Sequence, residues 1–211
     1  MVLNLDFIKK GPILFIGCHP DDIELGCGGL LNKIKNQYTI FALTLSKNQV
    51  NSSNKNLIKE QKKSLDSLGI KNSKNIVADF TTREMFKERQ EICDYLWTIK
   101  KKINPTCVFV TPNDLHQDHQ VCNIEAQRVF RDCTILEYFI SRSTFFDKPR
   151  IFVELSKTNI DAKIKALKNY KTYKNKNYFY EDSIWTSSKF FGSKSELEYC
   201  EVFNPISMII K

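Results

Sequence analysis

The sequence is short of several features, and each shortage excludes a class of protein. No apolar run approaches the roughly 20 residues that a membrane helix needs, so we expect no membrane span. The seven cysteines are odd in number, form no CxxC pair and lie inside apolar segments. This pattern favours reduced, packed thiols over disulfides or a zinc ribbon. Cys18 and Cys27 flank a polar motif described below, so a metal role for them stays open.

The N-terminal segment lacks the features of a secretory signal. It carries Asp6, Lys9 and Lys10 and has neither a continuous apolar stretch nor a small-residue cleavage site. We therefore expect a cytoplasmic protein. The composition, 42% hydrophobic and 27% charged over 211 residues, is that of a globular protein, and residues 1–211 are expected to form a single domain. A homo-oligomer stays open.

Basic residues are in excess, with a formal net charge of +8. A nucleic-acid surface is one interpretation of such a charge. However, arginine is scarce, and no stretch alternates arginine with aromatic residues. We therefore favour a solvated, lysine-rich surface and expect no nucleic-acid partner. The charge also suits an anionic substrate, such as a nucleotide-linked sugar.

Apolar runs alternate with amphipathic segments along the chain. The expected strands are 12–17, 39–45, 75–80, 106–111, 134–139 and 151–155. The expected helices are 28–37, 57–68, 88–103, 119–130, 159–170 and 187–199. This alternation is typical of an α/β fold, a three-layer sandwich with a mostly parallel sheet and helices on both faces. The Lys-, Asn- and Tyr-rich stretch 169–180 is expected to be a lid or a plain surface loop.

Two short polar motifs follow two of the expected strands. The motif HPDD occupies residues 19–22, directly after an apolar run, and HQDH occupies residues 116–119, shortly after another. All three histidines of the chain lie in these two motifs. An open α/β sheet binds its ligands at the carboxyl ends of its strands, so we expect both motifs to converge on one site.

Three residues of these motifs are candidate metal ligands. His19 and Asp22 are three residues apart in a turn that leaves a strand, and His119 could reach the same point from the second strand. Two imidazoles and one carboxylate with open coordination positions suit a catalytic Zn²⁺, and Fe²⁺ is possible with the same set. The alternative for Asp21 and Asp22 is a pair that caps the following helix.

The remaining polar residues of the motifs suggest hydrolysis of an acyl group, most naturally an amide. Asp21 is free to act as a general base on a water activated by the metal. His116 could stabilise an oxyanion or protonate a leaving amine, and Asp118 could orient its imidazole. The alternative for His116 is an orienting surface residue. Asp114 is either a support for a ligand or a turn residue.

A glycine-rich segment, Gly26-Cys27-Gly28-Gly29, follows the first motif. A phosphate cradle at a helix start is one interpretation. The segment is not GxGxxG, and the second strand ends without an acid that could bind a ribose, which argues against NAD. We favour close packing of a helix against the sheet.

These residues resemble the PIG-L/LmbE-like family of metal-dependent de-N-acetylases. The similarity is carried by the blocks HPDDIELGCGG, residues 19–29, and PNDLHQDHQ, residues 112–120, and continues more weakly to residue 203. The resemblance implies a Rossmann-like fold and removal of N-acetyl groups from amino sugars, often ones linked to lipids or other carriers. It also implies zinc bound by His19, Asp22 and His119, with Asp21 as base and His116, supported by Asp118, facing the tetrahedral intermediate.

The sequence departs from the family pattern at two positions where members often carry arginine. These positions hold Leu57 and Phe191. Either the substrate differs from that of the family, or other cations such as Arg83, Arg89 or nearby lysines bind an anionic substrate instead. The alternative for Arg83 and Arg89 is a pair of solvated surface charges. The predicted function is a zinc-dependent N-deacylase of an amino sugar, nucleotide- or lipid-linked. The alternative is a catalytically degenerate member that binds a sugar or nucleotide-sugar without turnover.

Overall fold

A seven-stranded sheet forms the centre of the computed structural model, which describes residues 11–144 and 148–209. The strands are β1 (Ile13–Gly17), β2 (Ile40–Thr44), β3 (Asn75–Val77), β4 (Cys107–Val110), β5 (Thr134–Tyr138), β6 (Ile151–Glu154) and β7 (Cys200–Ser207). The helices are α1 (Asp22–Ile34), α2 (Leu57–Ser67), α3 (Arg89–Ile103), α4 (Gln117–Val129), α5 (Lys157–Leu167) and α6 (Glu181–Ser193). Short 3-10 turns cover Ser52–Asn54, Asn72–Lys74, Lys171–Tyr173 and Asn177–Phe179.

The strand order is β3-β2-β1-β4-β5-β7-β6. Strands β1 to β5 are parallel, whereas β7 runs antiparallel between β5 and β6. From β1 the chain adds β2 and β3 toward one edge of the sheet, and it then adds β4 and β5 on the other side of β1. The strand order therefore reverses between β1 and β4. In sheets of this kind the crevice outside that junction is the usual ligand site.

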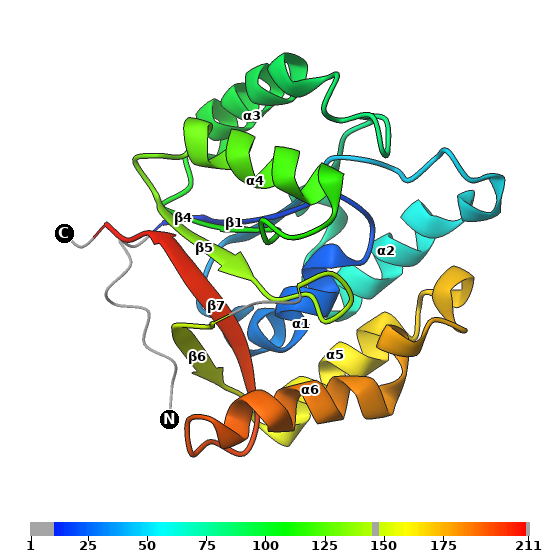
Figure 1. The fold of residues 1–211 in the computed structure, drawn as a ribbon, viewed down its shortest axis with the longest axis vertical. Helices are drawn as coiled ribbons and strands as arrows, with labels where there is room; N and C mark the ends of the chain where they lie inside the picture. The colour runs from blue at the N-terminus through cyan, green and yellow to red at the C-terminus, as the bar shows by residue number, and fades with distance from the viewer. Residues whose placement is uncertain (1–10, 145–147, 210–211) are drawn as a thin grey trace.

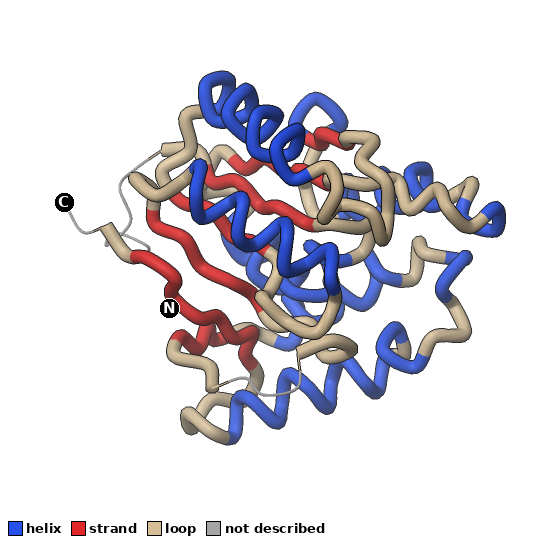
Figure 2. Tube along the Cα trace, turned by 45° about the horizontal axis from the view of Figure 1, so that its top comes forward, coloured by secondary structure: helices blue, strands red, loops and turns tan. Residues whose placement is uncertain are grey.

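Helices cover both faces of the sheet, which confirms the expected three-layer α/β fold (Figures 1 and 2). Helices α3 and α4 lie on one face, and α1, α2, α5 and α6 lie on the other. The central strands are buried on both sides, so successive residues of one strand enter different cores. In β1, Phe15 packs toward α1, while Leu14 and Ile16 pack toward α3 and α4.

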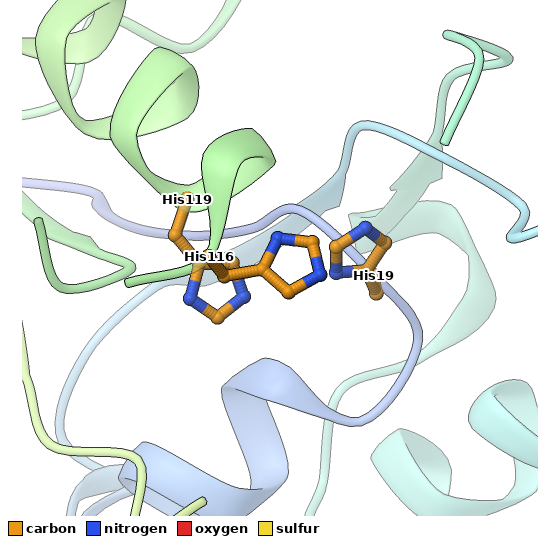
Figure 3. A group of neighbouring side chains, drawn as sticks. All are labelled: His19, His116 and His119. Carbon is orange, nitrogen blue, oxygen red and sulfur yellow. The ribbon is translucent and has the colours of Figure 1, made fainter. Parts of the chain in front are cut away.

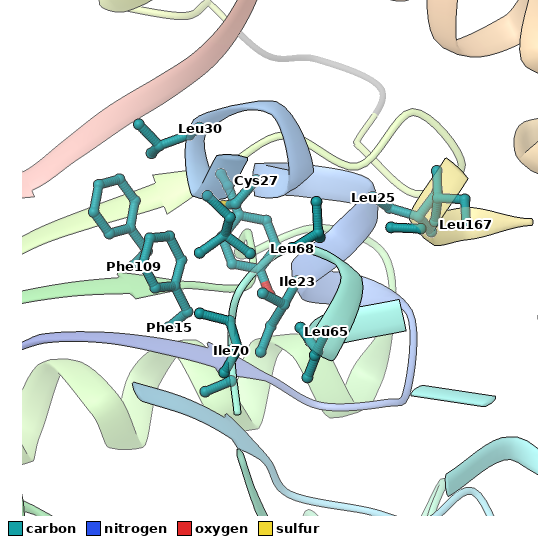
Figure 4. Packing of buried hydrophobic residues seen from close by; sticks show 14 of the residues in the cluster. Phe15, Ile23, Leu25, Cys27, Leu30, Leu65, Leu68, Ile70, Phe109 and Leu167 are labelled. Carbon is teal, nitrogen blue, oxygen red and sulfur yellow. The ribbon is translucent and has the colours of Figure 1, made fainter. Parts of the chain in front are cut away.

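The larger core is built around stacked aromatic rings under α1 (Figure 4). Phe15 and Phe109 come from paired positions of β1 and β4, and their rings lie parallel with centroids 4.6 Å apart. Phe203 of β7 meets Phe109 edge-on at 5.3 Å. Offset or edge contacts of this kind stabilise a core beyond simple area burial, and they hold the two strands that lead into the polar motifs.

The glycine-rich segment lies within α1 and packs closely, as its sequence favoured. A Cβ on Gly26 would lie 2.2 Å from the Tyr138 ring, and one on Gly29 would lie 2.4 Å from Leu155. The prediction that this helix begins at residue 28 was wrong, because it begins at Asp22. Glycines disfavour a helix locally, but here close tertiary packing outweighs that propensity.

Other differences from the predicted elements lie in the second half of the chain. The prediction omitted β7, whose residues Cys200–Ser207 form the longest strand of the described sheet. Helix α6 begins at Glu181, six residues before the predicted start at 187. The prediction about a signal peptide concerns residues that lie mostly in 1–10, outside the described part. Within the described residues, 11–144 and 148–209, no helix is long and apolar enough to cross a membrane.

Candidate active site

The two polar motifs meet at the carboxyl ends of β1 and β4, where the strand order reverses. The turn after β1 carries His19, and the N-terminal end of α4 carries His116 and His119 (Figure 3). The three rings face one another, with His116 stacked on His119 at 4.7 Å between centroids and 4.8 Å from His19. The predicted convergence of the three histidines is therefore present in the fold.

A sharp turn between β1 and α1 positions the two neighbouring acids. Asp21 occupies the N-cap position with φ of 109°, a conformation that non-glycine residues rarely adopt. Its carboxylate makes no capping hydrogen bond, so the alternative of a simple helix cap does not describe it. Asp22 instead accepts hydrogen bonds at Oδ2 from the backbone N–H groups of Cys18 and His19, at 2.9 and 2.8 Å.

The Asp22 carboxylate lies between the two histidines that were predicted to share a metal with it. Its Oδ2 is 3.7 Å from His19 Nδ1 and 3.5 Å from His119 Nε2. Burial opposes ionisation of Asp22, but the charge of His119, with further contributions from His19, holds its pKa well below the usual value. The residue is thus an ionised carboxylate facing two ring nitrogens.

Asp114 fixes the orientation of His119. Both of its carboxylate oxygens lie 3.1 Å from His119 Nδ1, which leaves Nε2 directed at Asp22. Burial alone would lower the pKa of His119, but the charge of Asp22 and the hydrogen bond that His119 donates to Asp114 raise it to about 10. A carboxylate behind a histidine is the usual support of a metal-binding imidazole, because it sets the tautomer and the ring direction. Of the two interpretations of Asp114, the support of a ligand is the one that the geometry favours.

Asp118 lies on a different partner from the expected one. Its Oδ2 is 2.9 Å from His19 Nε2 and accepts the Arg83 backbone N–H at 2.8 Å, so the carboxylate orients His19. Its contact with His116 is made by the backbone, whose N–H donates to His116 Nδ1 at 3.2 Å. The physical reason is the helix itself, since His116 caps α4 and turns its own Nδ1 onto the N–H two residues later.

His116 is a neutral imidazole in this arrangement. Burial, together with the positive charge of His19 and His119, lowers its pKa to about 4. A standing imidazolium at this position, as the sequence suggested, is therefore disfavoured at pH 7. His116 could still accept a proton when negative charge develops in front of it.

The donor set fits a divalent cation. His19, His116 and His119 offer ring nitrogens that lie within 4.8 Å of one another, and Asp22 adds the carboxylate. One more oxygen near these donors lacks a hydrogen bond: Asp118 Oδ1 is buried and accepts none from a described residue. A bound cation or its water would satisfy such an oxygen. Cys18 Sγ also lies near Asp22 and His119, but it donates to the Asp118 carbonyl at 3.1 Å, and burial raises its pKa well above the usual value. A protonated thiol is a poor metal ligand.

Asp21 lies beside this donor set without belonging to it. Its side chain lines the same cavity and is 7% exposed. Burial, and then the charge of Asp22, raise the pKa of Asp21 well above its usual range, while Lys176 acts in the opposite direction. A carboxylate whose pKa is raised is a better proton acceptor at neutral pH than an ordinary one.

A cavity of about 320 Å³ opens above these residues. Arg83 lines it, as the sequence led us to expect. Arg89, the first residue of α3, does not line the cavity. Its guanidinium pairs instead with the fully buried carboxylate of Glu125 in α4. Leu57 and Phe191, which replace the expected arginines, also lie away from the cavity lining. Leu57 is buried in the core under α2, and Phe191 packs against Phe139.

The sequence did not single out several residues that line this cavity. They are Asn48, Thr82, Ile140, Arg142, Ser143, Tyr173, Lys176 and Tyr178. The only signal among them was the composition of segment 169–180, considered as a lid or a plain loop. That segment supplies Tyr173, Lys176 and Tyr178 to the cavity.

Comparison with known proteins agrees with the motifs. The family model described as PIG-L: GlcNAc-PI de-N-acetylase matches residues 14–130. The uncharacterized deacetylase YaiS of Escherichia coli (strain K12) is 27% identical over 172 residues, which cover 78% of this chain and 92% of YaiS. The chain thus belongs to the PIG-L family of de-N-acetylases, as its sequence predicted.

Solved structures share the fold across almost the whole chain. The conserved protein TT1542 from Thermus thermophilus superposes with a TM-score of 0.78 at 19% identity, covering 94% of this chain and 96% of that one. The N,N'-diacetylchitobiose deacetylase from Pyrococcus horikoshii also gives a TM-score of 0.78, at 20% identity, covering 94% of this chain and 84% of that one. At these identities the comparison establishes the Rossmann-like sandwich.

Proposed function

We propose that the chain is a metal-dependent hydrolase that removes an N-acyl group, in practice N-acetyl, from an amino sugar. The observation that carries the proposal is the position of Asp22 Oδ2, which lies 3.7 Å from His19 Nδ1 and 3.5 Å from His119 Nε2, with Asp21 buried beside it. Membership of the de-N-acetylase family supports the reaction class. The resemblance to an N,N'-diacetylchitobiose deacetylase supports an amino-sugar substrate.

We assign His19, Asp22 and His119 as the metal ligands, with Zn²⁺ as the first candidate and Fe²⁺ as the second. When bound, the ion would supply Lewis acidity, which polarises the amide carbonyl and makes a water easier to deprotonate. Asp114 behind His119 and Asp118 behind His19 hold the two imidazoles in place. The backbone N–H groups of Cys18 and His19 do the same for Asp22.

The protein groups around this centre divide the proton transfers between them. Asp21 accepts the proton of the attacking water, because its raised pKa makes it an adequate base. His116 faces the same space from the N-terminal end of α4 as a neutral imidazole. Because its Nδ1 accepts the Asp118 N–H, its Nε2 carries the hydrogen and donates a hydrogen bond to the oxyanion that develops on the amide. The proton that Asp21 took from the water then passes to the nitrogen of the leaving amine, which balances the step. Asp118 acts on His116 only through its backbone N–H and their shared electrostatics.

The site draws on residues beyond the part that the family model matches. The family model ends at residue 130, yet Arg142, Tyr173 and Lys176 line the same cavity. The strands that follow also join the same sheet, since β7 inserts between β5 and β6. We propose that residues 1–211 act as a single deacetylase domain on a substrate that is linked to a nucleotide or a lipid.

The rival function is a degenerate family member that binds a sugar without turnover. The two replaced arginines were its sequence support, but Leu57 is in the core and Phe191 lies outside the cavity lining. A pure binding protein would not require a buried Asp21 that makes no capping hydrogen bond beside the His19, Asp22 and His119 donor set.

The test is acetate release from a panel of N-acetylated sugars, sugar phosphates and nucleotide-sugars, with zinc-loaded and chelator-treated protein. We expect one class to release acetate only with metal present. Binding of a sugar without acetate release under any metal condition would favour the rival.

A further inference from the structure

A second groove adjoins the catalytic cavity. It has a volume of about 560 Å³ and runs between segments 48–54, 82–83 and 172–176. The groove and the catalytic cavity share Asn48, Thr82, Arg83, Tyr173 and Lys176 as walls. The two spaces are therefore neighbours, and the linked part of a ligand seated over Asp21 would lie next to the groove.

The groove is rich in hydrogen-bond donors and contains no acidic residue. Its remaining walls are Val50, Asn51, Ser52, Ser53, Asn54 and Thr172. Arg83 and Lys176 are its two cations. Neither has a carboxylate within ion-pair distance among residues 11–144 and 148–209, and the same holds for Arg142 in the catalytic cavity.

The backbone holds Arg83 rigidly at the junction of the two spaces. Its φ is 69°, in the left-handed region that a residue with a long side chain rarely occupies. Its N–H donates to Asp118 Oδ2 at 2.8 Å, and its carbonyl accepts from Gln117 Nε2 at 2.7 Å. Strained conformations persist where the surroundings fix them, and they cluster at functional sites. Asn48, a second wall of the junction, also has a positive φ of 55°.

Three contacts hold the segment that carries Lys176. Tyr170 donates its hydroxyl to Glu24 at 2.7 Å, and the backbone N–H of Thr172 donates to Glu60 at 3.2 Å. Asn48 Nδ2 donates to the Tyr173 hydroxyl at 2.9 Å. These contacts place Lys176 Nζ 3.4 Å from the centroid of the Tyr173 ring. Burial lowers the pKa of Lys176, while the charge of Asp21 opposes that effect.

Compensation of the catalytic acids explains only part of this charge. Lys176 faces Asp21 electrostatically and partly offsets it. However, the catalytic cavity already contains two carboxylates and three cations, the latter being Arg83, Arg142 and Lys176. The groove has no carboxylate, and its two cations, Arg83 and Lys176, are residues that it shares with the cavity. The positive charge is therefore concentrated at the junction of the two spaces, where a substrate seated over Asp21 would carry its linked group.

We infer that this groove, with Arg83 and Lys176 at its junction with the catalytic cavity, is a subsite for a phosphate group of the substrate. The inference rests on the proposed function, since it assigns an N-acetylated sugar phosphate or diphosphate as the substrate class. Guanidinium groups bind phosphate through charge-assisted, often bidentate hydrogen bonds. Some donors of the groove are already bonded within the protein, as are those of Asn48, Ser53 and Asn54. Among the described residues, the amide nitrogen of Asn51 and the hydroxyls of Ser52 and Thr172 supply further donors.

The kinetic test compares N-acetylglucosamine with UDP-N-acetylglucosamine and with a short-chain lipid diphosphate of the same sugar. We expect a higher kcat/KM for one or both phosphorylated substrates than for the free sugar, and the two arms distinguish a nucleotide from a lipid carrier. Arg83→Gln should reduce that preference by about 10-fold or more, since hydrogen bonds to charged groups contribute that much. Arg83→Lys should restore part of it. The matched control is Lys87→Gln, an exposed lysine of the same segment that pairs with Glu84 and lines neither space.

A binding measurement separates this inference from the proposed reaction. Calorimetry of UDP on chelator-treated protein, where no metal ion can bind the anion, should show binding that Arg83→Gln and Lys176→Gln weaken and Lys87→Gln does not. Should no sugar be hydrolysed while this pattern holds, the reaction is wrong and the subsite stands. Acetate release that shows no preference for phosphorylated substrates, or a preference that Arg83→Gln leaves intact, would overturn the subsite.

Discussion

Replacing Asp21 by asparagine separates the proposed base from the proposed ligands. Asparagine keeps the size of the side chain and its hydrogen-bonding capacity, but it cannot accept the proton of a water. A positioned general base contributes about 10²–10⁴-fold to a rate, which corresponds to about 2.7–5.4 kcal/mol of barrier. We expect acetate release to fall by that factor while the bound metal stays at one equivalent.

The structure also predicts the effect of this substitution on stability. The pKa of Asp21 is raised in the folded chain, mainly by burial and then by Asp22. Folding of the metal-free protein therefore becomes less favourable as pH rises from the unfolded value of about 3.9 toward the folded pKa. Asp21→Asn removes this penalty, so the metal-free variant should unfold at a higher temperature than the wild type at pH 7. Below the unfolded pKa the difference should vanish.

The assay measures acetate release, metal content and thermal unfolding on the same preparations, with Asp22→Asn as the matched variant. Asp22→Asn should lose metal, because its Oδ2 faces both His19 and His119. Equal loss of metal in the two variants would show that the roles of the acids are wrongly assigned. A fall of less than 10-fold for Asp21→Asn, with metal retained, would mean that the base is another group.

Three further predictions follow from individual contacts. His119→Ala should abolish metal binding, whereas His116→Ala should retain the metal and lose turnover; loss of metal in both, measured by elemental analysis, would make His116 a ligand. Asp114→Asn should weaken metal affinity by about 10–100-fold, since both carboxylate oxygens contact the His119 ring; an unchanged affinity in a metal titration would contradict the orienting role. Gly26→Ala should destabilise the fold by about 1–3 kcal/mol, because its Cβ would lie 2.2 Å from the Tyr138 ring; unchanged urea unfolding would show that the ring moves aside freely.

The parts of the fold that the sequence predicted are those with a local signal. Buried parallel strands are continuous apolar runs, so β1, β2, β4 and β5 were located to within a residue at each end. The strand β7 lacks such a signal, because Asn204 and Pro205 interrupt it and its pairing partners lie far away in sequence. The early start of α1 was hidden for a similar reason, since its glycines are favourable only when Tyr138 and Leu155 pack against them.

The same distinction holds for the candidate site. The histidines and acids of the two motifs could be assigned to one site because each motif lies shortly after the end of a strand. Partners of individual side chains were less predictable. Asp118 orients His19, which is 99 residues away, and not its near neighbour His116. Arg89 pairs with Glu125, a contact between two helices that no spacing rule shows. Lys176 joins the cavity only because its segment is held by contacts with α1, α2 and segment 46–56.

A zinc titration of chelator-treated protein, followed by acetate release from an N-acetylated sugar substrate, tests the central proposal most directly. The proposal predicts no acetate without metal, a linear rise in rate, and a plateau at one zinc per chain. His19→Ala, Asp22→Asn and His119→Ala should each remove the response at the same zinc concentrations. Acetate release that is independent of metal, or zinc uptake that survives all three substitutions, would contradict the assignment of this site.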